Sequence, residues 1–188
     1  MSIDKAFYRG PIWFEHGILS SMKKPTLFIL TGPPGAGKNT IASQFLQKLT
    51  KYAVIDVDSV RQMVVQPHKA PWEGVAGKAQ QELGTHNASM LAVSFLRAGY
   101  SVLVLDVITD RTAKIYKQQL RGLDPKIILL LPKFKEVQKR NRNRPPRLKD
   151  KEIKMLYRWQ QELTVFDKKI DNTNVSATQV VKQLLSLQ

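Results

Sequence analysis

Two kinds of apolar pattern alternate along most of the chain: short β-branched runs, and longer segments whose apolar positions recur every three or four residues. The alternation begins near Lys24 and is typical of βαβ units, which build a parallel sheet with helices on both faces. Strands are expected at residues 26–31, 53–57, 101–107 and 126–131, with a short fifth at 169–171. Helices are expected at 40–50, 76–98, 111–121 and 150–166, and a last one opens at the capping box of residues 176–179.

Residues 1–24 follow neither period. Their aromatic side chains are interleaved with a glycine and a proline: Phe7, Tyr8, Trp13 and Phe14. We predict an N-terminal aromatic arm that either packs on the domain surface or binds a partner. The remaining residues, 25–188, have an ordinary length for a single domain.

Composition excludes several classes of protein. The chain has no cysteine, which rules out disulfides, thiolate metal sites and cysteine nucleophiles. No apolar run approaches the roughly 20 residues that span a bilayer. The N-terminus carries Asp4, Lys5 and Arg9 in place of an apolar signal region. A cytoplasmic protein that does not enter a membrane is therefore expected.

Positive charge is the one unusual feature of the composition. The formal net charge is +15, and residues 111–158 alone hold 16 Lys or Arg against 4 Asp or Glu. Such density attracts polyanions, including nucleotides and nucleic acids. It indicates either a solvated basic face or a nucleic-acid surface, although no known nucleic-acid module accompanies it.

The strongest motif is a glycine-rich segment between the first expected strand and a helix. It reads Gly32-Pro33-Pro34-Gly35-Ala36-Gly37-Lys38-Asn39-Thr40 and matches G-x-x-x-x-G-K. Glycines let successive N–H groups point at phosphate oxygens, and the helix N-terminus adds its positive dipole end. Lys38 would bring a mobile charge to the β- and γ-phosphates. The motif predicts ATP binding, against the alternative of a chance glycine turn.

One position departs from this pattern. A serine or threonine usually follows the lysine and ligates Mg²⁺, whereas here Asn39 follows and Thr40 comes one place later. Gly-Lys-Asn-Thr resembles the Gly-Lys-Gly-Thr of adenylate kinases, whose hydroxyl is also one place late. Asn39 and Thr40 are thus metal candidates, and direct contact between the loop and the metal stays open.

Carboxylates follow two of the expected strands. In an open parallel sheet, ligands bind outside the carboxyl ends of the strands, where Asp58 and Asp106 are expected. Asp58 is a candidate general base for a hydroxyl acceptor, or a helix N-cap. Arg61, one helical turn on, would hold an acceptor phosphate or orient Asp58. Asp106 would hold Mg²⁺ through water, or be a turn residue at the strand end.

An arginine-rich segment lies after the fourth expected strand and a short helical stretch. Residues 139–147 carry five arginine or lysine side chains, and Pro145 and Pro146 break any helix there, so a loop or lid is expected. Charge on a transferring phosphoryl group must be neutralised. Arg140 and Arg144 are the first candidates for that role and Arg147 is the third. The alternatives are a solvated loop or a clamp on a nucleic-acid backbone.

These motifs resemble the AAA-like P-loop kinases, which include polynucleotide 5′-kinases, chloramphenicol and related antibiotic phosphotransferases, and zeta-toxin-like enzymes. The resemblance runs from Pro25 to about Gln188. It rests on three segments: the phosphate loop, Asp58-Ser59-Val60-Arg61-Gln62, and the arginine-rich Arg140–Arg147. In polynucleotide kinases, a similar Asp-x-x-Arg pairs a general base with an arginine that binds the acceptor.

The resemblance implies a fold, cofactors and further contacts. The fold would be a doubly wound α/β P-loop NTPase with strand order 2-3-1-4-5 and a lid, and the cofactors ATP and Mg²⁺. Asp171-Asn172-Thr173 is similar to the segment beside the adenine, which implies nucleotide contacts from Asn172 and Thr173. His68 and Trp72 lie in a stretch similar to acceptor-side segments, although Trp72 is as well explained by core packing.

The sequence therefore favours an ATP-dependent phosphotransferase and leaves its acceptor open. A small-molecule hydroxyl, on a metabolite or an antibiotic, is preferred because the chain is compact. A polynucleotide 5′-hydroxyl is the close alternative, supported by the charge and by Asp58–Arg61. Two other classes remain, an ATP-hydrolysing switch that regulates a partner and a basic binding protein with a relic phosphate loop. The pattern does not indicate an oligomeric state.

Overall fold

The computed structural model describes residues 24–46, 50–143 and 148–187. Five parallel strands form one sheet: β1 (Leu27–Thr31), β2 (Tyr52–Asp56), β3 (Ser101–Asp106), β4 (Lys126–Leu130) and β5 (Lys168–Ile170). Their order, β2-β3-β1-β4-β5, confirms the predicted fold class and strand order. The arm predicted for residues 1–24 lies outside the described residues, apart from Lys24.

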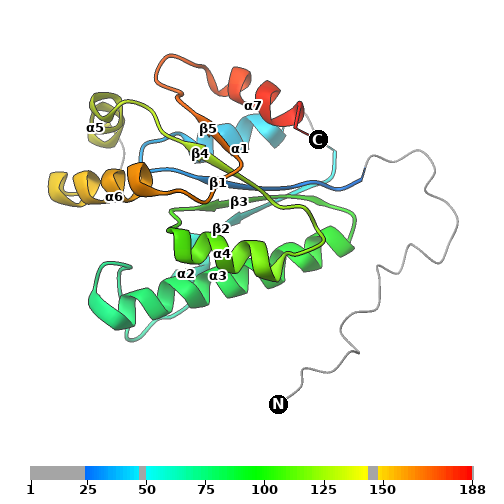
Figure 1. Ribbon diagram of the computed structural model, residues 1–188, viewed down its shortest axis with the longest axis horizontal. Coiled ribbons are helices and arrows are strands. Elements are labelled where there is room, and N and C mark those ends of the chain that lie inside the picture. The colour runs from blue at the N-terminus through cyan, green and yellow to red at the C-terminus, as the bar shows by residue number, and fades with distance from the viewer. Residues whose placement is uncertain (1–23, 47–49, 144–147, 188) are drawn as a thin grey trace, which may run out of the picture.

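Helices cover both faces of the sheet (Figure 1). One face carries α1 (Lys38–Leu46) and α7 (Ala177–Leu185), and the other carries α3 (Gly74–Arg97) and α4 (Asp110–Gln119). Since a parallel sheet is buried on both sides, its strands read as continuous apolar runs, and β1 is buried at every position. Each face has its own hydrophobic core, one around Phe28 and Phe45 and one around Ile29 and Tyr116.

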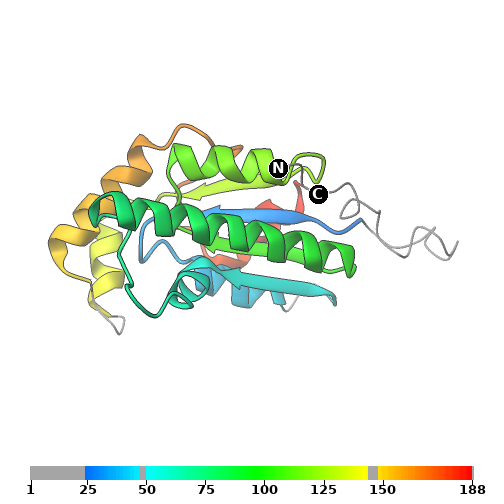
Figure 2. The ribbon, with the colours of Figure 1, turned by 90° about the horizontal axis from the view of Figure 1, so that it is seen from below.

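Three further helices gather at the carboxyl end of the sheet. They are α2 (Val57–Gln62), α5 (Phe134–Arg142) and α6 (Asp150–Glu162). Figure 2 shows α3 lying along the sheet, with its first turns at that end, near α5 and α6. Within the described ranges, every helix is too short or too polar to cross a membrane.

Several expected boundaries were wrong by a few residues. Helix α1 starts at Lys38, two residues early, because the phosphate loop runs directly into it. Val57 begins α2 and is not part of a strand, because the Asp56 side chain caps that helix. Helix α6 stops at Glu162, since Leu163 has extended backbone angles. Part of the expected lid was also wrong: residues 139–142 are helical and belong to α5, while residues 144–147 lie outside the described part.

Candidate active site

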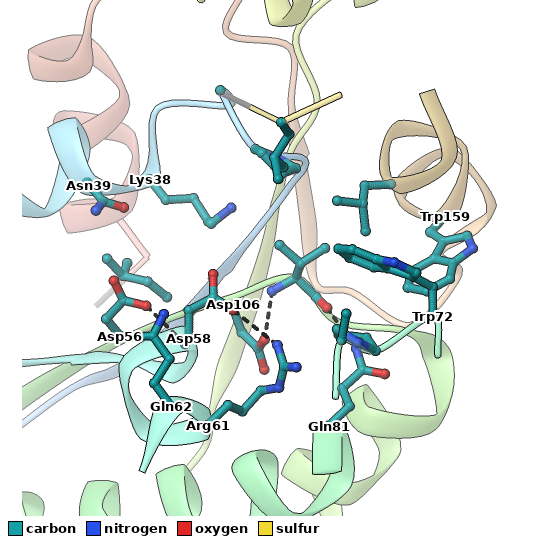
Figure 3. Close-up of a pocket in the computed structure, with 18 of the residues that line it drawn as sticks. Lys38, Asn39, Asp56, Asp58, Arg61, Gln62, Trp72, Gln81, Asp106 and Trp159 are labelled. Carbon is teal, nitrogen blue, oxygen red and sulfur yellow. Dashed lines mark hydrogen bonds and ion pairs between the residues drawn. The ribbon is translucent and has the colours of Figure 1, made fainter. Parts of the chain in front are cut away.

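A pocket of about 790 Å³ opens where the strands end. Its walls come from the phosphate loop, α2, the segment between α2 and α3, the ends of β3, and α5 and α6 (Figure 3). We call the side near Lys38 and Asn39 the donor end and the side near Trp72 and Trp159 the acceptor end. Most of the residues predicted for the site line this one pocket: Pro34, Gly35, Gly37, Lys38, Asn39, Thr40, Asp58, Arg61, His68, Trp72, Asp106 and Arg140.

The phosphate loop needs its glycines. Gly32, Gly35 and Gly37 have φ of 152°, 88° and 96°, a region that residues with a side chain rarely adopt. A Cβ on Gly32 would also collide with the carbonyl of Leu130. Lys38 Nζ donates to the carbonyl of Gly32 at 2.7 Å, and helix α1 begins at Lys38. The first N–H groups of α1 therefore open onto the pocket, as an anion site at a helix N-terminus requires.

Arg140 lies against this loop and not at the acceptor end. Its guanidinium donates to the carbonyls of Gly35 and Asn172, at 3.5 Å and 3.2 Å, and pairs with Glu136 at 2.8 Å. Asn172 in turn donates to the carbonyl of Ala36 at 2.7 Å, and its own Oδ1 is buried without a hydrogen-bond partner. Arg140 therefore brings positive charge to the phosphate loop and lines the pocket, whereas Asn172, predicted as a nucleotide contact, is buried behind the loop and does not line the pocket.

Of the other predicted contacts, one is placed differently and two are not described. Thr173 accepts from the N–H of Lys133 at 2.8 Å and donates to Asp171, and it does not line the pocket. Arg144 and Arg147 lie outside the described residues. Gly32, Pro33 and Ala36 are buried and shape the loop from behind.

Asp58 faces the pocket from the first turn of α2. The capping role that competed for it belongs to Asp56, whose Oδ1 accepts the N–H of Asp58 at 3.1 Å. The side chain of Asp58 is 71% exposed, and its Oδ1 receives Arg61 Nη1 at 3.3 Å. Arg61 is only 9% exposed, and its Nη2 donates to the carbonyl of Lys69 at 3.1 Å. The pair therefore places an open carboxylate on a buried, fixed partner.

Gly84 gives Arg61 the room to lie flat under the pocket. A Cβ on Gly84 would stand 2.5 Å from Arg61 Cγ and 3.1 Å from Arg61 Cδ. Gly77, two turns earlier on α3, similarly faces the backbone of Ala70, next to Trp72. Both glycines are needed because α3 packs closely against Arg61 and Ala70. The sequence around each glycine does not indicate this packing.

We expect Gly84→Ala to lower phosphoryl transfer although alanine favours a helix by about 1 kcal/mol. Overpacking a buried site costs about 1–3 kcal/mol, and here the group that must move is the arginine that holds Asp58. The kcat for transfer should fall about tenfold while ATP affinity stays unchanged. Steady-state kinetics beside Asn87→Ala, an exposed control on α3, checks this. Equal kcat values in the two variants would contradict the role of Gly84.

Asp106 is the buried carboxylate of the site. Its Oδ1 accepts the N–H of Val107 at 2.7 Å and its Oδ2 accepts the hydroxyl of Tyr116 at 2.9 Å. Burial raises the pKa of Asp106 to about 6, an effect that these two hydrogen bonds and Lys38 oppose and that the charge of Asp58 reinforces. Asp106, Asp58 and Lys38 are therefore close enough to feel one another's charge.

These residues fit a nucleotide-bound Mg²⁺ better than a metal held by protein alone. In the described part of the chain, no three acidic or histidine side chains come together as a metal site. Each Asp106 oxygen has one donor and keeps a second lone pair for a metal-bound water. Asn39 and Thr40 are exposed on the same pocket. Mg²⁺ usually keeps several waters and takes phosphate oxygens with one or two protein ligands, which this set can supply.

The sequence did not point to several residues of the acceptor end. Trp159, Leu148 and Leu156 reach the pocket from α6 and the residue range just before it, and Gln81 reaches it from α3. Gln160, next to Trp159, is fully buried: its amide donates to the carbonyl of Ile108 at 2.7 Å and accepts from the Thr31 hydroxyl at 2.7 Å. The sequence signal that could have indicated this part of the site was Gln160, a polar residue on the apolar stripe of α6.

Comparison with known proteins agrees with this architecture. A tunicamycin resistance protein from Deinococcus radiodurans has 19% identity and a TM-score of 0.64, over 88% of this chain and 95% of its own. Shikimate kinase from Acinetobacter baumannii, in complex with shikimate, has 16% identity and a TM-score of 0.59, over 87% and 92%. A chain of the Pnkp1/Rnl/Hen1 RNA repair complex has 18% identity and a TM-score of 0.56, over 79% and 49%.

At these identities the solved structures support the fold alone, and the family is assigned from the match of the sequence to a family model. Comparison with curated proteins gives no significant match. Residues 27–168 match a family described as an AAA domain, a range that includes the phosphate loop, Asp58, Asp106 and Arg140. The chain therefore belongs to the AAA domain family and has the fold of the P-loop kinases.

Proposed function

We propose that this protein transfers the γ-phosphoryl group of ATP to a hydroxyl of a small molecule. The observation that carries the proposal is a single pocket with a phosphate loop at one end and an open carboxylate, Asp58, beyond it. A donor site and a proton acceptor that share one enclosed space are what phosphoryl transfer to a hydroxyl requires.

The donor end would bind ATP through the loop N–H groups and Lys38. Arg140, which borders the loop and lines the pocket, would contact the nucleotide, and Asn172 would hold the loop in shape through the Ala36 carbonyl. Asn39, Thr40 and Asp106 would hold Mg²⁺ together with phosphate oxygens and water. Bound there, Mg²⁺ would offset negative charge on the phosphates.

Asp58, which Figure 3 shows between Lys38 and the two indoles, would take the proton of the attacking hydroxyl. The acceptor oxygen bonds to the γ-phosphorus while the bond from that phosphorus to the β–γ bridging oxygen breaks, and ADP leaves. Arg61 keeps the Asp58 carboxylate aimed into the pocket through the 3.3 Å contact. Arg61 contacts Asp58 through Nη1 and the carbonyl of Lys69 through Nη2, which supports a role in orienting Asp58.

A polynucleotide 5′-hydroxyl is the second candidate acceptor. The Asp58–Arg61 pair, which resembles that of polynucleotide kinases, and the net charge of +15 favour it. Binding of a nucleic acid releases counterions, so its affinity falls steeply as salt rises. A small neutral acceptor lacks that dependence, which separates the two candidates.

The test is a transfer assay with γ-labelled ATP and Mg²⁺, with Lys38→Ala as the inactive control. We expect label on members of a metabolite and antibiotic panel, at a rate that changes less than threefold between 50 and 300 mM salt. Label on 5′-hydroxyl DNA or RNA oligonucleotides, lost as salt rises, would replace the small molecule by the polynucleotide. Label found only as free phosphate would refute transfer and favour an ATP-hydrolysing switch.

A further inference from the structure

Two indoles stand together at the acceptor end. Trp72 and Trp159 both line the pocket and are both half-buried, so each keeps a face in contact with the open space. Figure 3 shows both on the side of the pocket away from Lys38 and Asn39. With Leu148, Leu156 and Pro71 they make this end of the pocket largely apolar. Aromatic walls of this kind favour flat rings, which stack on an indole face.

The backbone segment that carries each indole is held by its own set of hydrogen bonds. Trp159 sits on α6 beside Gln160, whose buried amide joins that helix to Thr31 and Ile108. Trp72 follows Ala70, and its segment is tied to α3 where Gln80 accepts the N–H of Lys69 at 2.8 Å and donates to the carbonyl of Pro67 at 2.6 Å. Neither anchor involves residues 144–147. The backbone that carries the two rings is therefore fixed before any ligand arrives, which reduces the entropy lost on binding.

The cations of the described pocket wall are engaged elsewhere. They are Lys38, Arg61 and Arg140. Lys38 and Arg140 contact the phosphate loop, and the charge of Arg61 is balanced by Asp58. The polar groups that the pocket wall adds on that side are the amide of Gln81 and the ring of His68, which belongs to the same segment as Trp72. Gln81 is fixed by donating to the carbonyl of Val107 at 3.1 Å. Burying an anion without a paired cation is costly.

From these observations we infer that the acceptor is an uncharged compound with a flat aromatic or heteroaromatic ring, which packs against Trp72 and Trp159 while a hydroxyl reaches Asp58. The inference rests on the proposed function for the identity of the ligand as an acceptor. It narrows the class to neutral aryl alcohols and nucleosides and, on the charges of the described part of the wall, favours them over phosphorylated or carboxylated acceptors.

The binding test uses the tryptophans themselves. The chain has three, so Trp13→Phe leaves only Trp72 and Trp159 to report. The probes are nucleosides and aryl-substituted alcohols, each matched to a ring-free alcohol and to a phosphorylated counterpart; thymidine, methyl 2-deoxyriboside and thymidine 3′-phosphate form one such set. We expect saturable quenching by neutral ring compounds and at least tenfold weaker binding of their partners. Absence of quenching by every ring compound at millimolar concentration would overturn the inference.

Variants of the indoles give a second readout. Stacking on one aromatic side chain is worth about 1–3 kcal/mol, so Trp72→Ala and Trp159→Ala should each raise the acceptor KM about tenfold or more. The KM for ATP should stay within twofold, and Trp72→Phe and Trp159→Phe should recover most of the loss. An unchanged acceptor KM in both alanine variants would overturn the inference even if the protein is a kinase.

The two proposals fail separately. Quenching by neutral ring compounds without transfer of label would retain the binding site and refute the kinase. Efficient transfer to a ring-free or phosphorylated acceptor would retain the kinase and refute the aromatic site.

Discussion

Asp58→Asn is expected to remove phosphoryl transfer and to leave ATP binding unchanged. A general base contributes about 10²–10⁴-fold to a rate, so kcat should fall by at least a hundredfold. The amide keeps the shape of the side chain and an oxygen for Arg61, whose Nη1 now lies 3.3 Å from the carboxylate. Since Asp58 stands at the start of α2 and not in the phosphate loop, the affinity for ATP should change less than twofold, as calorimetry would measure.

Asp56 offers the matched control for this variant. It is a neighbouring carboxylate that lines the same pocket, but its Oδ1 caps α2, and asparagine is as good an N-cap as aspartate. Asp56→Asn should therefore lose less than threefold in kcat although it removes the same charge. Equal losses in the two variants would mean that Asp58 acts through charge alone, and full activity of Asp58→Asn would refute its role as base.

The fold could be predicted from the chain because its causes are local. Buried parallel strands must be apolar on both faces, and amphipathic helices must show a 3.6-residue period. The apolar runs of β1, β3 and β4 can therefore be recognised as strands without tertiary information. The phosphate loop is equally local, since its glycines, its lysine and its helix are contiguous. The strand order came from resemblance, and the pairing of β1 with both β3 and β4 confirms it.

The acceptor end could not be predicted in the same way, because its residues meet only in the folded chain. Trp72 and Trp159 are 87 positions apart in the sequence, and Gly84 matters only because Arg61 packs over it. Asp58 shows the limit at short range. Two aspartates two residues apart could each cap the helix or face the pocket, and only the hydrogen bond from Asp58 to Asp56 assigns the cap to Asp56.

Asp106→Asn should make the protein more stable and less active. Burial raises the pKa of Asp106 to about 6 from an ordinary value of 3.8. The folded state thus favours the protonated form, and the stability this gives is complete below pH 4 and is lost as the pH rises through about 6. A pKa difference of about two corresponds to about 3 kcal/mol. Asparagine carries no charge, so the variant avoids this loss. Its one amide oxygen can still accept the N–H of Val107, while its NH2 group can donate to the hydroxyl oxygen of Tyr116.

The free energy of unfolding, measured with EDTA present, should therefore be about 3 kcal/mol higher for Asp106→Asn than for the parent chain at pH 7.5, and nearly equal at pH 4. The groups facing Asp106 are Tyr116, Asp58 and Lys38, and they are common to both proteins.

Asp110→Asn is a control for which we expect the opposite change in stability. Its burial is outweighed by hydrogen bonds from Thr164 and Val165, so the pKa of Asp110 is lowered, and removing this carboxylate should cost stability at pH 7.5 and less at low pH. With Mg²⁺ and ATP, transfer by Asp106→Asn should fall at least tenfold, because the metal loses its anionic partner. If the variant is less stable than the parent at pH 7.5, the charged Asp106 carboxylate does not destabilise the folded protein, and this prediction is wrong.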